Sequence, residues 1–198
     1  MQTNVYEGQK KSIIIFEVSR EEFAIDLLDV QEIIRAGHVR RLPQSLDFID
    51  GIYNYRGDII HIINLRKKLN LDKYQVYKSK SELYESVEGE QDAEMDQSES
   101  NENDSGNKYI IIVNVNENKI GFYADKIHKV SQVSVEDMVD LTPVFQTNVS
   151  VDYIKGVIKF EDRPRILINL SKILTEAEKL MIQKELDSLN ENKPNKKS

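Results

Sequence analysis

The 198-residue chain contains no cysteine. This absence excludes disulfide bridges, thiolate zinc sites and cysteine nucleophiles together. Glycine is also scarce, with eight residues, and no glycine-rich phosphate loop, nucleophile elbow or two-histidine zinc helix is present. An EF-hand loop starting at Asp92 would need glycine and glutamate where the chain has Gln97 and Asn103. We therefore expect no cofactor and no metal site.

Long apolar runs are absent as well. The longest unbroken runs are four residues, for example 110–113, whereas a membrane-spanning helix needs about 20. The first eleven residues, MQTNVYEGQKK, hold no apolar segment, so they do not form a secretory signal. We expect a flexible N-terminus at 1–11, no insertion into a membrane, and a cytoplasmic protein.

The net charge of −7 comes from one segment. Ten acids and no lysine or arginine lie between Glu82 and Asp104, and without them the chain has 24 acidic and 27 basic residues. Such a polar, single-signed stretch cannot bury enough surface to become ordered, which predicts a disordered acidic insertion at 78–107. It separates two ordered stretches, about 12–77 and 108–175.

Basic residues gather at 35–41 and 66–68, but acids lie close to both groups. A nucleic-acid surface would need more cations, interleaved with aromatic residues. We interpret both groups as solvated, salt-bridged faces and expect no nucleic-acid partner.

Both ordered stretches have the alternating pattern of β-hairpins. Apolar residues alternate on either side of a polar turn at 19–22, and again on either side of a polar turn at 116–119. A longer repeat relates 47–69 to 152–174 at a constant offset of 105, with eight identities in 23 positions. Two copies of one unit are indicated. The sequence therefore predicts an all-β fold of two five-stranded modules, each plausible as a closed barrel without exposed edges.

Helices are expected only in short pieces and at the C-terminus. Each repeat ends in a short helix, at 65–69 and 170–174. Thr175 and Glu178 have the spacing of a capping box, and Ile182, Leu186 and Leu189 then lie on one helical face. Residues 176–198 are thus predicted as a C-terminal helix with a basic tail. The helix either packs on a barrel or, as a second interpretation, binds a partner.

Two motifs carry a family resemblance. Val-Gln-Glu-Ile at 30–33, followed by FIDGIYNYRGDIIHIINLR at 48–66, resembles the CheW family, the coupling proteins of bacterial and archaeal chemotaxis. The resemblance continues through 120–127 and 153–156 and covers about 12–175, apart from the acidic insertion. It implies two intertwined SH3-like five-stranded β-barrels. It also implies a non-enzymatic adaptor that connects the cytoplasmic tip of methyl-accepting chemoreceptors to the regulatory domain of the histidine kinase CheA, at membrane-associated receptor arrays.

The resemblance also implies site residues. Receptor contact in this family lies in the groove between the barrels, where Val30, Ile33 and Ile127 would offer apolar side chains. Glu32 and Arg56 match the family's glutamate and arginine, and together they could form a bidentate pair. That pair either contacts the receptor or only holds a loop. The counterpart of Arg56 in the second repeat is Glu161, and a feature of one copy alone favours function.

Three glycines are expected to have structural roles, through positive φ or close chain approach: Gly51, Gly57 and Gly156. The repeat supports Gly51, which matches Gly156, but Gly57 matches Asp162. Tyr55 stands where the family usually has leucine, which we interpret as a tolerable apolar change.

Two alternatives to the chemotaxis adaptor remain open. One is a CheW-like scaffold of a different signalling array. The other is a hydrolase in which His128 and a neighbouring acid such as Asp125 form an acid–base pair.

Overall fold

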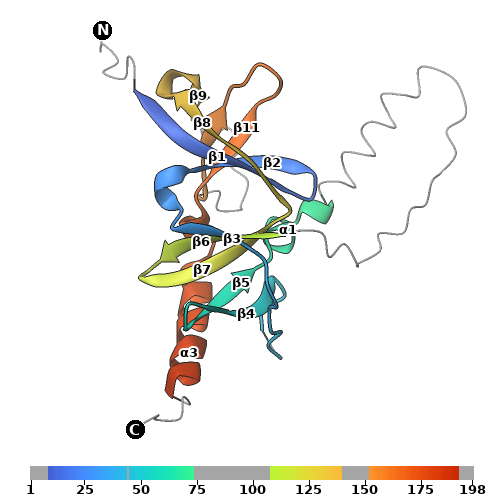
Figure 1. Ribbon diagram of the computed structural model, residues 1–198, viewed down its shortest axis with the longest axis vertical. Helices are drawn as coiled ribbons and strands as arrows, with labels where there is room; N and C mark the ends of the chain where they lie inside the picture. The colour runs from blue at the N-terminus through green and yellow to red at the C-terminus, as the bar shows by residue number, and fades with distance from the viewer. Residues whose placement is uncertain (1–8, 44, 74–107, 140–151, 192–198) are drawn as a thin grey trace, which may run out of the picture.

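The computed structural model describes residues 9–43, 45–73, 108–139 and 152–191, and strands dominate it (Figure 1). The strands of the first half are β1 (Lys10–Val18), β2 (Glu21–Asp26), β3 (Glu32–Arg35), β4 (Ile49–Tyr55) and β5 (Asp58–Ile63). Those of the second half are β6 (Tyr109–Val115), β7 (Asn118–Ala124), β8 (Lys126–Ser134), β9 (Met138–Val139), β10 (Ile154–Ile158) and β11 (Arg165–Ile168). The helical elements are η1 (Leu27–Asp29), α1 (Leu65–Lys68), η3 (Val135–Asp137), η5 (Leu170–Lys172) and α3 (Glu176–Glu191).

The strands form two sheets. Sheet A has the order β8-β1-β2-β11-β10-β9, and sheet B has the order β3-β6-β7-β5-β4. Figure 1 shows sheet A in the upper part of the molecule and sheet B below it, with α3 beside sheet B. The all-β fold class is confirmed.

The sheets do not follow the two halves of the chain. The hairpin β1–β2 belongs to the first half but pairs in sheet A, and the hairpin β6–β7 belongs to the second half but pairs in sheet B. Residues 12–77 and 108–175 thus contain the two copies of the repeat, yet neither stretch supplies a whole sheet. This exchange of hairpins is the intertwining that the family resemblance implies.

Backbone pairing does not close either sheet into a full barrel among the described residues. β3 and β4 are the two ends of sheet B. The chain that follows β3 returns to β4 at one point, where Arg40 and Ile52 exchange two N–H···O bonds of 2.9 Å. Sheet B therefore curls until its edges approach, but the ladder itself stays open.

Three apolar clusters hold the sheets. One lies between the sheets, and each sheet encloses a smaller one of its own. β1 serves two of them, because Ile13 and Ile15 point into the cluster of sheet A while Ile14 and Phe16 point between the sheets. β6 does the same with residues 110–113. Burial on both faces explains why these two strands carry the longest apolar runs in the chain.

The repeat appears in the structure as equivalent elements. β4, β5 and α1 correspond to β10, β11 and η5, and both strand pairs have a register shift at the same place, at Ile49/Gly51 and at Ile154/Gly156. The predicted short helices are an α-helical turn at 65–68 and a 3₁₀ turn at 170–172.

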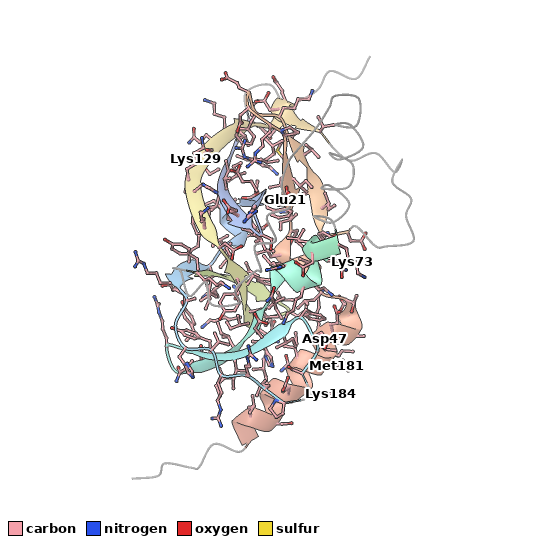
Figure 2. The ribbon with its side chains drawn as sticks, turned by 90° about the vertical axis from the view of Figure 1, so that its right-hand side faces the viewer. Glu21, Asp47, Lys73, Lys129, Met181 and Lys184 are labelled. Carbon is pink, nitrogen blue, oxygen red and sulfur yellow. The ribbon has the colours of Figure 1, made fainter. Side chains whose placement is uncertain are left out.

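The C-terminal helix begins with the predicted capping box. The Thr175 N–H donates to Glu178 Oε2 over 2.8 Å, and the Glu178 N–H donates to the Thr175 hydroxyl oxygen over 3.3 Å. Ile182 and Leu186 are buried in the cluster between the sheets. Figure 2 shows Met181 and Lys184 on α3, and both side chains are exposed. The helix thus packs against the sheets, which agrees with the first of the two interpretations, a helix that packs on a barrel.

α3 also buries a histidine. His61, on β5, is fully buried, and its Nε2 lies 2.9 Å from Glu185 Oε2 on the helix. His61 is therefore a hydrogen-bonded residue of the strand. Its Nδ1 is buried and finds no hydrogen-bond partner among the residues that the structure describes.

Several predictions fall outside the described residues. They concern the acidic insertion at 78–107, the basic tail and most of the N-terminal stretch. β1 begins at Lys10, so the end of the stretch predicted as flexible at 1–11 is strand. Among the residues that the structure describes, no helix is long and apolar enough to cross a membrane.

Candidate functional site

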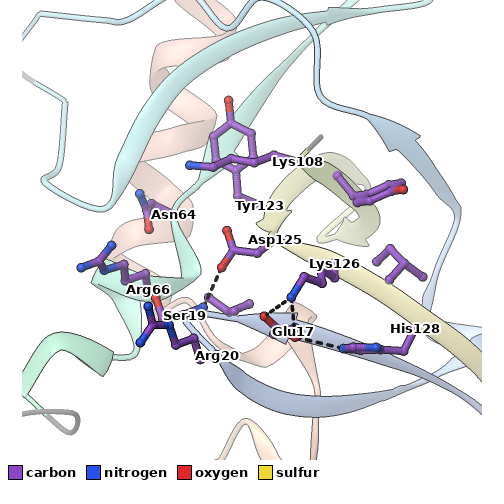
Figure 3. A pocket seen from close by; sticks show the side chains of 13 residues that line it. Glu17, Ser19, Arg20, Asn64, Arg66, Lys108, Tyr123, Asp125, Lys126 and His128 are labelled. Atoms are coloured by element: carbon purple, nitrogen blue, oxygen red, sulfur yellow. Dashed lines mark hydrogen bonds and ion pairs between the residues drawn. The ribbon is translucent and has the colours of Figure 1, made fainter. Parts of the chain in front are cut away.

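A groove of about 840 Å³ lies where sheet A meets sheet B. Its walls come from both halves of the chain, with 17–20, Asn64 and Arg66 from the first half and 108–109, Tyr123 and 125–128 from the second. Figure 3 shows these side chains from close by. The groove exists in this form because the hairpins are exchanged.

Short polar contacts fix one wall of the groove. Asp125 Oδ2 accepts the Ser19 N–H over 2.6 Å, which ties the β1–β2 turn to the end of β7 (Figure 3). Glu17 Oε1 lies 3.0 Å from Lys126 Nζ, and Glu17 Oε2 lies 3.2 Å from His128 Nε2. The wall is therefore cross-linked by groups more than 100 residues apart in sequence.

These contacts bear on the hydrolase alternative. His128 lies against Glu17 and, at 3.8 Å, against Glu22, whereas Asp125 binds a backbone N–H. The two members of the suggested acid–base pair thus have different partners. Within the described ranges, no group of three or more His, Cys, Asp or Glu side chains could hold a metal ion.

A second polar cluster lies on sheet B. Glu32, at the start of β3, accepts hydrogen bonds from Tyr55 and Arg56, which lie at the end of β4 and in the turn after it. Arg56 Nη2 is 2.8 Å from Glu32 Oε1, and the Tyr55 hydroxyl donates to Oε2. Glu32 and Arg56 are therefore together, but their bond is single rather than bidentate, because the tyrosine takes the other carboxylate oxygen.

Tyr55 is the residue that sequence reasoning undervalued. Its ring is 5% exposed, with Arg56 Cζ 5.2 Å and Lys119 Nζ 5.3 Å from the ring centre. The hydrogen bond to Glu32, with burial as a second cause, raises the pKa of the phenol above its ordinary value of 10.0. The signal was present in the sequence, since a tyrosine in place of leucine adds a hydroxyl that needs a partner when buried.

The cluster joins the two edges of sheet B. β3 and β4 are its end strands, so the carboxylate of Glu32 continues the closure that the Arg40–Ile52 bridge begins. Arg56 still presents a side chain that is 71% exposed. The geometry thus allows both roles considered for the pair, with Tyr55 buried, Glu32 partly buried and Arg56 accessible.

The three apolar site residues are distributed over the region between the sheets. Val30, Ile33 and Ile127 are all partly buried and pack against the central cluster. Ile127 lines the groove and lies in register with Phe16 of β1. Val30 and Ile33 do not line that groove, and Ile33 lies on the opposite face of β3 from Glu32.

An exposed apolar residue next to Val30 was not predicted. Leu28, in η1, is 92% exposed, and Leu27 beside it is 38% exposed. η1 is fixed by Asp26, which accepts the Leu28 N–H over 3.0 Å, and by an ion pair of 2.6 Å between Asp29 and Lys155. The sequence signal is the paired leucines at the point where the strand alternation of β2 ends.

The three glycines have positive φ, at 146° for Gly51, 91° for Gly57 and 155° for Gly156. Gly51 also lies against the chain, because a Cβ there would be 2.2 Å from the carbonyl oxygen of Arg40. A Cβ at Gly57 would meet no atom within 4 Å. Close approach is thus a property of Gly51, whereas Gly57 serves the turn.

Comparison with known proteins agrees with this geometry. A family model described as a CheW-like domain matches residues 12–178. The chemotaxis protein CheW of Treponema pallidum is 28% identical over 169 residues, which cover 84% of this chain and 83% of that protein. CheW of Klebsiella aerogenes is 26% identical over 172 residues, which cover 87% of this chain and 86% of that protein.

A solved structure supports the same assignment. The crystal structure of the scaffolding protein CheW from Thermoanaerobacter tengcongensis is similar with a TM-score of 0.59 and 25% identity, and the match covers 83% of this chain and 92% of that one. The family match extends over most of the chain, through both repeats and the start of α3. The chain therefore belongs to the CheW family.

Proposed function

We propose that this protein is a non-catalytic chemotaxis adaptor. It couples the cytoplasmic tips of methyl-accepting chemoreceptors to the regulatory domain of the histidine kinase CheA. The observation that carries the proposal is the match of residues 12–178 to the CheW-like domain, together with a groove that both halves of the chain line and that includes Ile127. The protein acts in the cytoplasm, where receptor arrays recruit it.

The receptor contacts the region between the sheets. Val30, Ile33 and Ile127 supply partly buried apolar surface, and Leu28, two residues before Val30, adds an apolar side chain that is 92% exposed. Exposed apolar residues rimmed by polar groups are typical of protein-binding surfaces. Arg56 contributes the exposed charge, and Glu32 and Tyr55 hold its position.

Coupling works by linkage rather than by chemistry. A receptor state that binds one conformation of the adaptor more tightly shifts the adaptor toward that conformation. The equilibrium of the attached kinase shifts by the same difference in binding free energy. Because the Ser19–Asp125 hydrogen bond ties the β1–β2 turn of sheet A to the end of β7 in sheet B, a change at one sheet is passed to the other.

Calorimetry tests the proposal directly. The full chain is titrated with a receptor-tip fragment and, separately, with a CheA regulatory domain. Binding of both is expected, and binding of neither would overturn the assignment.

Two arginine variants separate contact from loop support. Arg56→Ala is compared with Arg41→Ala, which changes another exposed arginine. We expect Arg56→Ala to weaken receptor binding at least threefold with an unchanged melting curve, and Arg41→Ala to bind as the wild type. A lowered melting midpoint for Arg56→Ala with normal receptor binding would show that the pair only holds the turn.

A further inference from the structure

The two exchanged hairpins are structurally equivalent. Residues of β1–β2 correspond to residues of β6–β7 at an offset of 97. Their turns have the same left-handed backbone, with φ of 52° and 67° at Ser19 and Arg20 and of 47° and 68° at Asn116 and Glu117. Both hairpins are antiparallel with a two-residue turn.

The hairpins also join their sheets in the same way. β2 pairs in parallel with β11, with Phe23 opposite Ile166, and β7 pairs in parallel with β5, with Ile120 opposite His61. The offsets of 97 and 105 convert one register into the other. The parallel pairings therefore do not determine which hairpin joins which sheet.

The charged side chains at the two parallel pairings, β2 with β11 and β7 with β5, do differ. In sheet A, Glu22 of β2 lies 2.7 Å from Arg163 and 2.6 Å from Arg165. Burial opposes ionisation of Glu22, but hydrogen bonds from the two arginines outweigh it and hold its pKa below the ordinary value of 4.5.

In sheet B the signs are reversed. Lys119 of β7, the equivalent of Glu22, lies 2.8 Å from Asp58, which is the equivalent of Arg163. Without the exchange, Glu22 would face Asp58, and Lys119 would face Arg163 and Arg165. Every contact would then join like charges.

We propose that these reversed charge pairs specify the exchange, by directing β1–β2 to sheet A and β6–β7 to sheet B. A single exposed ion pair contributes little stability. The choice between two arrangements, however, depends on the difference between attraction and repulsion at both junctions together. The side chains of Glu22 and Arg165 are 14% and 9% exposed, so salt screens their interaction less than that of a surface pair.

The exchange has a consequence for the groove, whatever partner the groove binds. It brings Ser19 to Asp125 and Glu17 to Lys126. The charge pairs thus determine a conformation in which the two halves share one wall.

Charge reversal tests the proposal. The hairpin-reversed variant is Glu22→Lys with Lys119→Glu, the sheet-reversed variant is Asp58→Arg with Arg163→Asp, and the quadruple variant combines them. Each also receives Asn114→Cys and Glu161→Cys for spin labels, since the chain has no cysteine of its own and both positions are exposed.

The label distance reports the arrangement. Asn114 lies in sheet B and Glu161 lies beside the β10–β11 turn of sheet A, so the wild type gives a long distance. Without the exchange, Asn114 would occupy the place of Glu17, in register with Glu22 and hence near Arg163, and the distance would be short.

We expect the hairpin-reversed variant either to gain the short distance or to fail to fold. The quadruple variant should regain the long distance and melt between the hairpin-reversed variant and the wild type, because Arg165 is unchanged and still repels a lysine at position 22. A folded hairpin-reversed variant with only the long distance would overturn the proposal. So would a quadruple variant that folds no better than the hairpin-reversed one.

Discussion

The substitution Gly51→Ala is expected to unfold the sheet B edge. A Cβ at this position would be 2.2 Å from the carbonyl oxygen of Arg40, and φ is +146°. The neighbouring atom is backbone, so the chain around Arg40 must move, and its two 2.9 Å hydrogen bonds with Ile52 are lost. Backbone strain costs about 1–3 kcal/mol, and each hydrogen bond contributes about 0.5–1.5 kcal/mol. We expect a loss of about 4 kcal/mol in the free energy of unfolding.

The control for this prediction is Gly57→Ala. Gly57 has φ of +91°, but a Cβ there would meet no atom within 4 Å. Only the left-handed backbone is then unfavourable, at about 1–2 kcal/mol. Urea unfolding gives the free energy of unfolding of both variants, provided that its dependence on urea concentration has the same slope as for the wild type. If Gly51→Ala is no less stable than Gly57→Ala, the contact between the chain at Arg40 and β4 does not contribute to stability as expected.

Three further predictions concern α3 and the cluster of Tyr55. Burial opposes ionisation of Glu178, but hydrogen bonds, first that from Lys68, outweigh it and hold its pKa below 4.5. Glu178→Gln should therefore lower the free energy of unfolding by about 2 kcal/mol at pH 7. In an acid titration this difference should vanish as the pH falls through the lowered pKa. Tyr55→Phe should lower the free energy of unfolding at neutral pH, because the hydrogen bond to Glu32 is lost. Since the pKa of the phenol is raised, this difference should be full below pH 10 and disappear as the pH rises through the raised pKa. An equal cost at all pH values would contradict this. Ile182→Ala should lower the free energy of unfolding by about 3 kcal/mol, because it leaves a cavity. The control Met181→Ala, at a side chain that is 57% exposed, should change it by no more than about 0.5 kcal/mol. Equal effects in chemical unfolding would mean that α3 does not pack as described.

The sequence predicts the local elements of this fold well, for physical reasons that can be named. Alternation predicts the hairpins, because every second residue, such as Ile14 and Phe16 of β1, points to the cluster between the sheets. The constant offset of 105 predicts that β4–β5 and β10–β11 are equivalent. The capping box at Thr175 and Glu178 marks where α3 begins, because its hydrogen bonds are local.

Long-range arrangement is what alternation does not reveal. The apolar runs of β1 and β6 do not show which sheet each strand joins, because that depends on contacts between residues far apart in sequence, such as Glu22 and Arg165. His61 is buried because α3 covers it, which a strand pattern cannot show.

The site was predicted in part for the same reason. Motif matching identified Glu32 and Arg56, which the structure places 2.8 Å apart. It did not identify Tyr55, whose hydroxyl uses the second carboxylate oxygen, nor Leu28, whose exposure depends on the turn after β2. Both depend on where a side chain points, and that is fixed by packing rather than by residue type.

The central claim of the proposed function is that one adaptor binds receptor and kinase at the same time, which requires different surfaces. It is tested by titrating a CheA regulatory domain into the full chain that has been saturated with a receptor-tip fragment. We expect the kinase domain to bind with an unchanged stoichiometry and to form a ternary complex. Displacement of the receptor fragment, one molecule for each kinase domain bound, would show a single shared surface and would contradict the account.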